Sequence, residues 1–434
     1  MTTGPPQPRM LVEWLAIGAG LAVFGYVGWD GALWDARLQL LLHVIGVGAI
    51  LGLGVVVLRG GGLPRTRIDV PLLGLLAAFA LATASALNVG MSLRAMAAIA
   101  GFAAMLPVAI LAVRHRPAWV GIVTSVPVLL LATPALAVQL ARRLEWILAG
   151  APGLPPLRLP AEGTPFGSVA VPPFVIIPAW ALAGLIEPAW LRRVVRIGLV
   201  AVGVPMTILS GSRSAWLAIA ATALVAVTPL VWRSRHRLRW PSRITWRAVA
   251  VGVGALAILG LATALALPRL TAVTSLLYRV ALWRDTVAAW QSDPLLGIGP
   301  GFMPYARQAA APDFTFPVRQ PHSHNLPLGV LGDAGLVGLL AAVILVIALL
   351  VVAGPWRSRT GVGRTAGIVL IGLAIGGLFE DLTFIPGFDL LAITLVAVAL
   401  LDAGAVEWVR PRLTPTRRWA AIALAGGAAC SVLL

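Results

Sequence analysis

The sequence predicts an all-α polytopic membrane protein, a single transmembrane domain over residues 1–434 with about 12 transmembrane helices. Composition gives the first reason: 59% of the 434 residues are hydrophobic, only 11% are charged, and the mean hydropathy is +0.93. A water-soluble protein of this length cannot bury so much apolar surface. The pattern gives the second reason, because the apolar residues gather in runs of about 20, enough for a helix to cross a bilayer.

We expect a membrane-spanning helix wherever such a run occurs. The first run continues directly into the series, so it is not read as a cleavable signal peptide. A last apolar run, 419–434, is short, and we leave open whether it spans the membrane. In chain order the expected spans are 11–29, 38–58, 70–87, 92–113, 118–140, 169–187, 194–210, 214–232, 248–268, 326–353, 365–380 and 388–404.

Arginine sets the expected orientation. With a cytoplasmic N-terminus, most of the 33 basic residues fall on the cytoplasmic side, as the positive-inside rule requires. The charges of the outer loops then balance, and the formal net charge of +17 is cytoplasmic. We attribute this charge to topology and to contact with anionic membrane lipids, and expect no nucleic-acid partner. The single cysteine, Cys430, excludes an intrachain disulfide and a cysteine-based metal site.

Two outer loops are expected to be long, 141–168 and 269–325. The second should carry short helices, and its first part has one apolar face at helical spacing. We expect this part to lie at the membrane surface, with tryptophans at the depth of the lipid headgroups. The residues of that face are Leu276, Arg279, Trp283, Val287 and Trp290.

The same orientation brings polar residues from distant segments to the outer face. Arg213 lies in the turn between two spans, Arg279 and Arg284 lie in the long loop, and His322 and His324 lie at its end. None of them was used individually to set the orientation. Residues so far apart in sequence can therefore meet in one cavity on that face.

Three segments of this face resemble the bacterial O-antigen ligase and O-antigen polymerase superfamily of membrane glycosyltransferases. Its ligases carry a His-Asn pair, nine residues and then Gly-x-x-Gly, which here are His324-Asn325 and Gly335-Leu336-Val337-Gly338. SGSRSAW looks like the family's Ser-Arg turn and contains Arg213. YRVALWRDTVAAWQSDPLLGIGPG looks like its Arg…Trp…Pro-Leu-x-Gly-x-Gly segment. That segment matches at Arg279, Trp283, Pro294, Gly297 and Gly299, and together the motifs cover about 200–340.

The resemblance implies a C-type glycosyltransferase-like fold in the bacterial inner membrane, with 269–325 as a periplasmic loop and the active site facing the periplasm. It also implies a glycan donor on undecaprenyl diphosphate and an acceptor such as lipid A–core. A neutral histidine can accept the proton of the acceptor hydroxyl, and arginine binds phosphate oxygens in a bidentate fork. The implied reaction is direct attack on the anomeric carbon with inversion.

We therefore assign His324 as the general base or acceptor-orienting residue, and Arg213 and Arg279 as the clamp on the diphosphate. Arg284, His322 and Asn325 are assigned to substrate contacts of second rank or to orienting these groups. The alternative for His324 is a structural role, anchoring the long loop to the span that follows it. The alternatives for Arg213 are helix capping or contact with lipid headgroups.

Carboxylates define a competing mechanism. Asp30 and Asp35 lie in the first outer loop, where other lipid-linked sugar transferases use acidic residues, but their spacing of five is not a tight pair. Glu380, Asp381 and Asp389 flank the last outer turn, where they can contact an arginine of the site or a sugar hydroxyl. No cluster has the ligand spacing of a metal site, so the sequence predicts an enzyme without metal or cofactor.

Several function classes stay open from the sequence. The complete His-Asn…Gly-x-x-Gly pattern favours the O-antigen ligase type. An O-antigen polymerase, whose acceptor is another lipid-linked repeat, and a protein O-oligosaccharyltransferase use the same donor chemistry. A transporter or lipid flippase should carry ionisable residues or broken helices at mid-membrane, whereas the polar residues here gather at one face. A purely structural scaffold would not need clustered outer arginines and histidine.

Overall fold

The structure, a computed structural model, describes residues 48–49, 51–53, 62–150, 172–234, 274–303, 306, 323–380 and 386–409. Nearly all of the described secondary structure is helical. In chain order the elements are β1 (Leu63–Thr66), α3 (Asp69–Ala84), α4 (Val89–His115), α5 (Pro117–Leu148), α6 (Pro172–Leu182), η2 (Ala183–Leu185), α7 (Ala189–Ser210), α8 (Arg213–Ser234), α10 (Thr274–Ser292), α12 (Leu326–Ala353), α13 (Gly361–Gly377), α14 (Pro386–Asp402) and β2 (Val406–Val409).

Four of the described helices, α4, α5, α7 and α12, are long and apolar enough to cross a membrane. Shorter apolar helices accompany them, among them α3 and α13. The described part of the chain is thus that of a mostly helical membrane protein, as predicted. The predicted spans 11–29 and 248–268 lie outside the described residues, as do the final run 419–434 and almost all of 38–58.

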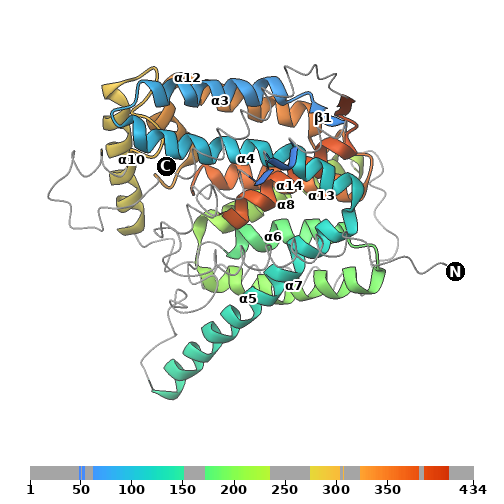
Figure 1. The fold of residues 1–434 in the computed structure, drawn as a ribbon. Helices are drawn as coiled ribbons and strands as arrows, with labels where there is room; N and C mark the ends of the chain where they lie inside the picture. Colours follow the sequence, from blue (N-terminus) through green and yellow to red (C-terminus); the bar gives the residue numbers. More distant parts are fainter. Residues whose placement is uncertain are drawn as a thin grey trace.

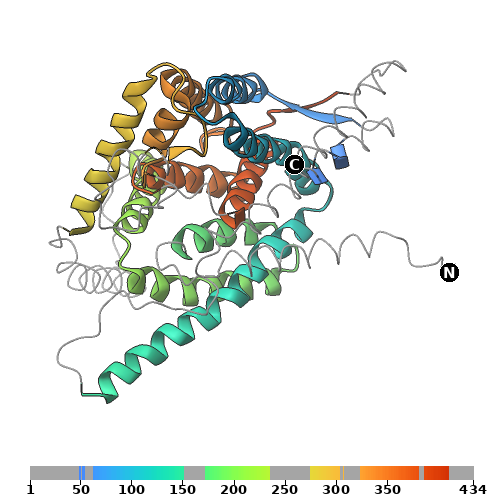
Figure 2. The ribbon, with the colours of Figure 1, turned by 60° about the vertical axis from the view of Figure 1, so that its left-hand side comes forward.

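The helices form a bundle with two distinct ends (Figure 1). Within it, α12 packs on α3, α4 on α14, and α13 on α8, while α6 contacts α5, α7 and α13. Helix α10 crosses one end of this bundle, and β1 lies at the other end, in both views (Figures 1 and 2). The end that α10 crosses is called the α10 end below, and the opposite one the sheet end.

The bundle is held together by close contacts between small and branched side chains. The main core contains fully buried alanines such as Ala132, Ala179 and Ala397, together with Leu199 and Leu395. Glycines bring helices closer still: a Cβ on Gly376 of α13 would stand 2.6 Å from the ring of Phe174 in α6. Helices in membranes associate through this kind of close packing, because lipid provides no hydrophobic driving force between them.

A two-stranded antiparallel sheet departs from the all-α prediction. Strands β1 and β2 pair with Arg65 opposite Glu407, and they join the segment before α3 to the segment after α14. The guanidinium of Arg114 stacks 4.3 Å above the ring of Trp408. Four-residue strands give little periodicity, so the sequence pattern did not predict them.

Two expected loops contain helix. Helix α5 has 32 residues and continues to Leu148, well inside the predicted loop 141–168. At about 1.5 Å per residue it is about 48 Å long, longer than the hydrocarbon core of a bilayer, and its last part extends beyond the bundle (Figures 1 and 2). Within the described part of the predicted loop 269–325, α10 is a helix of 19 residues.

Candidate active site

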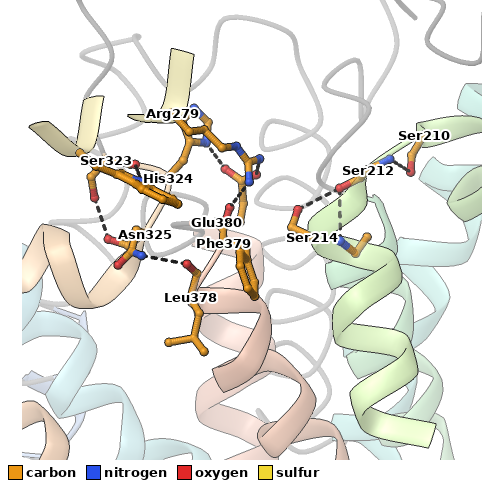
Figure 3. Close-up of polar contacts among 12 residues, drawn as sticks. Ser210, Ser212, Ser214, Arg279, Ser323, His324, Asn325, Leu378, Phe379 and Glu380 are labelled. Carbon is orange, nitrogen blue, oxygen red and sulfur yellow. Dashed lines mark hydrogen bonds and ion pairs between the residues drawn. The ribbon is translucent and has the colours of Figure 1, made fainter. Parts of the chain in front are cut away.

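A buried carboxylate joins two of the predicted site residues at the α10 end. Glu380 follows α13 and is 5% exposed. Its Oε1 contacts Nδ1 of His324, and its Oε2 accepts a hydrogen bond from Nη2 of Arg279 at 3.1 Å. Nη1 of Arg279 donates to the carbonyl of Phe379 at 2.7 Å. Figure 3 shows these side chains converging from α10, the start of α12 and the end of α13.

His324 stands in a strained backbone conformation, with φ of 51°, just before α12. A non-glycine residue in the left-handed region costs about 1–3 kcal/mol and persists only where neighbours hold it. The Ser323 hydroxyl donates to the carbonyl of Asn325 at 2.7 Å, and the indole of Trp283 donates to the carbonyl of Ser323 at 3.0 Å. The ring of Tyr278 meets the imidazole edge-on at 6.3 Å between centroids. The turn that aims His324 at Glu380 is therefore fixed from both sides.

Asn325 caps α12 and connects it to α13. Its Oδ1 accepts from the backbone N–H of Leu328 at 2.9 Å, as an N-cap residue does. Its Nδ2 donates to the carbonyl of Leu378 at 2.9 Å, two residues before Glu380. Both ends of the amide bind main chain, so Asn325 orients the segment that carries His324. The predicted substrate contact of Asn325 stays a prediction.

Helix α12 is broken at Gly335, whose φ of 61° and ψ of −162° lie outside the helical region. The main-chain groups released by the break are bonded by the loop after α10. The carbonyls of Gly332 and Asp333 accept from Ile298 and Gly299 at 3.0 and 3.1 Å. On the other side of the break, the N–H groups of Leu336 and Val337 donate to the carbonyls of Pro294 and Leu295 at 3.0 and 3.2 Å. We call this four-bond contact between residues 294–299 and 332–337 the glycine clasp.

One glycine from each of the two sequence motifs is needed where these two main chains touch. A Cβ on Gly335 would stand 2.3 Å from the carbonyl oxygen of Leu295, and one on Gly297 would stand 2.6 Å from that of Gly332. Both residues also have positive φ, which L side chains rarely adopt. The Gly-x-x-Gly and Pro-Leu-x-Gly-x-Gly motifs therefore form one interlocked unit. This unit fixes α10, with Arg279, against the start of α12, with His324.

The Ser-Arg turn lies on a neighbouring helix. Gly211 ends α7 in a left-handed conformation, and α8 begins at Arg213. The hydroxyl of Ser212 accepts from the backbone N–H of Ala215 at 3.3 Å and lies 3.0 Å from the hydroxyl of Ser214. Because α8 packs on α13, the turn belongs to the same end of the bundle as Glu380 (Figure 3). Arg213 thus starts a helix whose positive N-terminal dipole favours anions.

The remaining predicted residues have different surroundings. The side chain of Arg284 is 72% exposed, and its guanidinium bonds Asp285, its neighbour on α10, at 3.4 Å. The structure therefore does not place it against Glu380. His322, Asp30, Asp35 and Asp381 lie outside the described residues. Trp283 and Trp290, which were expected at the depth of the lipid headgroups, each donate a hydrogen bond within the protein, Trp283 to the carbonyl of Ser323 at 3.0 Å and Trp290 to the carbonyl of Pro294 at 2.9 Å. Their depth in the membrane stays a prediction.

Glu380 was considered in the sequence only as one of several carboxylates near the last outer turn. The one available signal was its position at the end of an apolar run, on the face that is expected to be the outer one. The expected contact of such a carboxylate with an arginine of the site is confirmed, since Glu380 bonds Arg279. The contact depends on residues 101 positions apart, so sequence spacing cannot reveal it.

A small apolar cavity lies beneath the Ser-Arg turn, between α6, α8 and α13. Its lining includes Phe174, Ala215, Ala218, Gly372 and Leu373. It is walled by these helices, and the expected cavity shared by the site residues on the outer face stays a prediction. Among the described residues, no group of three His, Cys, Asp or Glu is placed to hold a metal ion.

The comparisons with known proteins bear on the segment that holds most of these contacts. The family model described as O-antigen ligase matches residues 197–343. The match begins in α7, includes Arg213, Arg279 and His324, and ends in α12, after the break at Gly335. No curated protein matches the chain.

Proposed function

We propose that this chain, which belongs to the O-antigen ligase-like superfamily through its residues 197–343, transfers a glycan from undecaprenyl diphosphate to lipid A–core or a similar envelope acceptor. The reaction takes place at the periplasmic face of the bacterial inner membrane, without a metal ion. The observation that supports this best is the convergence of His324 and Arg279 on one buried carboxylate, Glu380. Base and phosphate-binding cation are thereby held together at one end of the bundle.

His324 acts as the general base in this proposal. In this proposal Nδ1–H of His324 donates a hydrogen bond to Glu380, so Nε2 is the nitrogen that takes the proton of the acceptor hydroxyl. The acceptor oxygen attacks the anomeric carbon, the bond from that carbon to the diphosphate breaks, and the electron pair leaves on the diphosphate oxygen. The imidazolium that forms is stabilised by the carboxylate beside it, as in other histidine–carboxylate pairs.

Arginines stabilise the leaving group. Arg279 is 24% exposed, so its guanidinium is partly shielded from water while it can still meet a ligand. Arg213 adds a second cation at the start of α8, where the positive end of the helix dipole also favours an anion. Cations aligned with a developing phosphate charge contribute several kcal/mol to transition-state stabilisation. Two arginines from different helices suit a diphosphate, which carries charge on two phosphorus centres.

The break in α12 does not favour the transporter alternative. Broken helices in transporters leave main-chain groups to bind substrate or ions. Here the glycine clasp satisfies four such groups on both sides of Gly335. The break therefore serves the packing of the loop after α10.

The test is a transfer assay on the purified full-length protein with undecaprenyl-diphosphate glycan as donor and EDTA present. Lipid A–core and additional donor are supplied as separate acceptors. We expect transfer to lipid A–core that is unaffected by EDTA and falls by about 10²–10⁴-fold in His324→Ala and Arg213→Ala. Glu407→Gln, at the sheet end, is the control and should transfer at the wild-type rate.

Other outcomes are equally informative. Growth of the donor glycan, with lipid A–core unused, would identify a polymerase that has the same site. Activity that requires a divalent metal, together with an unaffected His324→Ala variant, would show that the site assignment is wrong. Asp30, Asp35 and Asp389 would then be the residues to examine.

A further inference from the structure

Glu380 contacts both of the groups that the proposed reaction needs. One carboxylate oxygen meets His324 and the other meets Arg279. The side chain of Glu380 is 6% exposed, against 19% for His324 and 24% for Arg279. The carboxylate is thus the most buried of the three side chains.

The contacts of Arg279 point inward. Nη2 bonds Glu380 and Nη1 bonds the carbonyl of Phe379, near the C-terminus of α13. A guanidinium binds phosphate through the same paired N–H groups with which it binds a carboxylate. Glu380 and a diphosphate therefore compete for Arg279, and the negative charge of Glu380 also repels the diphosphate.

The charges of the site balance in two arrangements. Without donor, a partly buried Arg279 needs an anionic partner, and Glu380 provides it. With donor bound, the diphosphate neutralises Arg279, and Glu380 would be left as an uncompensated buried anion. Proton transfer from the acceptor hydroxyl to His324 supplies the missing cation beside Glu380.

We propose that Glu380 changes partners during the reaction, so that it is a positioning residue that also controls donor affinity. In the enzyme without donor it holds Arg279 and His324 together. When the diphosphate binds, Arg279 turns to the phosphate oxygens, and Glu380 keeps only its bond to Nδ1 of His324. No covalent step is added, because the carboxylate exchanges one ionic hydrogen bond for another. This inference rests on the proposed function.

The test separates binding from catalysis in full-length protein. Undecaprenyl diphosphate without a glycan serves as the binding probe, and transfer kinetics give KM for the donor and kcat. Glu380→Gln preserves the shape of the side chain and removes its charge. We expect it to bind the probe about tenfold more tightly, because Arg279 loses its charged competitor. We expect kcat to fall about 100-fold, because His324 loses the anion that stabilises its protonated form.

A fall in KM together with a fall in kcat distinguishes partner exchange from a structural role, which would weaken binding and slow turnover alike. The matched control is Glu407→Gln, the same substitution at the sheet end, which should change neither. In an Arg279→Gln background, Glu380→Gln should tighten binding by much less than tenfold, because only the charge repulsion is then relieved. If the full tenfold tightening persists there, charge repulsion alone explains it and the exchange is wrong.

Glu380→Asp provides a second variant should the first fail to fold. It keeps the charge that competes for Arg279, so we expect probe binding within about twofold of wild type, with kcat lowered because the shorter side chain no longer reaches Nδ1 of His324. Probe binding by Glu380→Asp that is clearly tighter than that of the wild type would overturn the inference. Unchanged or weaker binding by a folded Glu380→Gln would also overturn it. In either case, transfer by the wild type would still uphold the proposed function. Tighter binding by Glu380→Gln, without transfer by the wild type to any acceptor, would support the exchange and reject glycosyl transfer.

Discussion

The two ends of the bundle use their carboxylates differently. At the α10 end, Glu380 contacts a guanidinium and an imidazole, and it is buried. At the sheet end, Asp402 accepts from the backbone N–H groups of Arg359 and Thr360, at 2.8 and 3.1 Å through Oδ2. The first arrangement joins groups that can exchange protons and bind anions. The second joins the segment before α13 to the end of α14, and its hydrogen bonds within the described residues come from main-chain N–H groups.

The arginines of the two ends show the same contrast. Arg279 donates hydrogen bonds to the carbonyl of Phe379 and to the carboxylate of Glu380, both just after α13. Arg114 lies flat on the ring of Trp408, and the edge of His115 meets the same ring at 6.5 Å between centroids. A cation stacked on an aromatic ring is held by the ring's quadrupole and needs no anion. The comparison therefore predicts catalytic effects for changes at the α10 end and stability effects for changes at the sheet end.

The largest expected effect comes from the glycine clasp. Gly335→Ala introduces a Cβ that would stand 2.3 Å from the carbonyl oxygen of Leu295, at a φ that alanine rarely adopts. We expect the free energy of unfolding to fall by about 3 kcal/mol and the transfer rate to fall more than about tenfold, because α10 shifts from the start of α12. Thermal unfolding and transfer assays measure both. Gly74→Ala, which meets nothing within 4 Å in α3, is the control, and an equal loss there would remove the clasp from the explanation.

A smaller effect is expected from Trp283→Phe, which deletes one hydrogen bond to the carbonyl beside His324. A lost hydrogen bond costs about 1 kcal/mol, so we expect the transfer rate to fall about fivefold as the His324 turn loosens. Trp290→Phe deletes a similar bond on the same helix, to Pro294, and serves as the matched variant. Equal losses of transfer in the two variants would mean that the contact with Ser323 has no special role.

At the sheet end, Asp402→Asn tests whether a carboxylate there matters only for stability. We expect the free energy of unfolding to fall by about 1 kcal/mol, because the amide is a weaker acceptor for the N–H groups of Arg359 and Thr360. The donor KM and kcat should equal those of the wild type. A change in either constant would extend the functional region to the sheet end and contradict the contrast between the two ends.

The smallest effect is expected from Arg114→Gln, which removes the cation from the ring of Trp408. Exposed cation–π contacts are worth about 0.5–1 kcal/mol, so thermal unfolding should shift slightly and transfer should not change. Arg116→Gln, which removes an arginine from the same turn, provides the comparison. If Arg116→Gln shifts thermal unfolding more than Arg114→Gln does, the contact of Arg114 with Trp408 contributes no special stability.

Much of the helical fold follows from local sequence. The runs of apolar residues predicted helices that the structure places at α3 to α8 and α12 to α14, because apolar length alone specifies a membrane helix. For α12 the predicted bounds, 326–353, are those observed. The strands were missed because they form only by pairing with a segment distant in sequence. The last part of α5 was missed because the helix continues past its apolar run.

For the site, the amino-acid sequence predicted which polar residues could share one face of the membrane and which glycines the motifs contain. His324, Arg279 and the glycines of the clasp could be named because they stand at fixed spacings within single segments. Only the tertiary structure decided that Glu380 joins His324 to Arg279, that Arg284 turns away to Asp285, and that the two glycine motifs bind each other. Hydrogen bonds and ion pairs form only between groups that are close in space, which the sequence does not give. Whether a segment forms a membrane helix depends mainly on its own length and polarity, which the sequence does give.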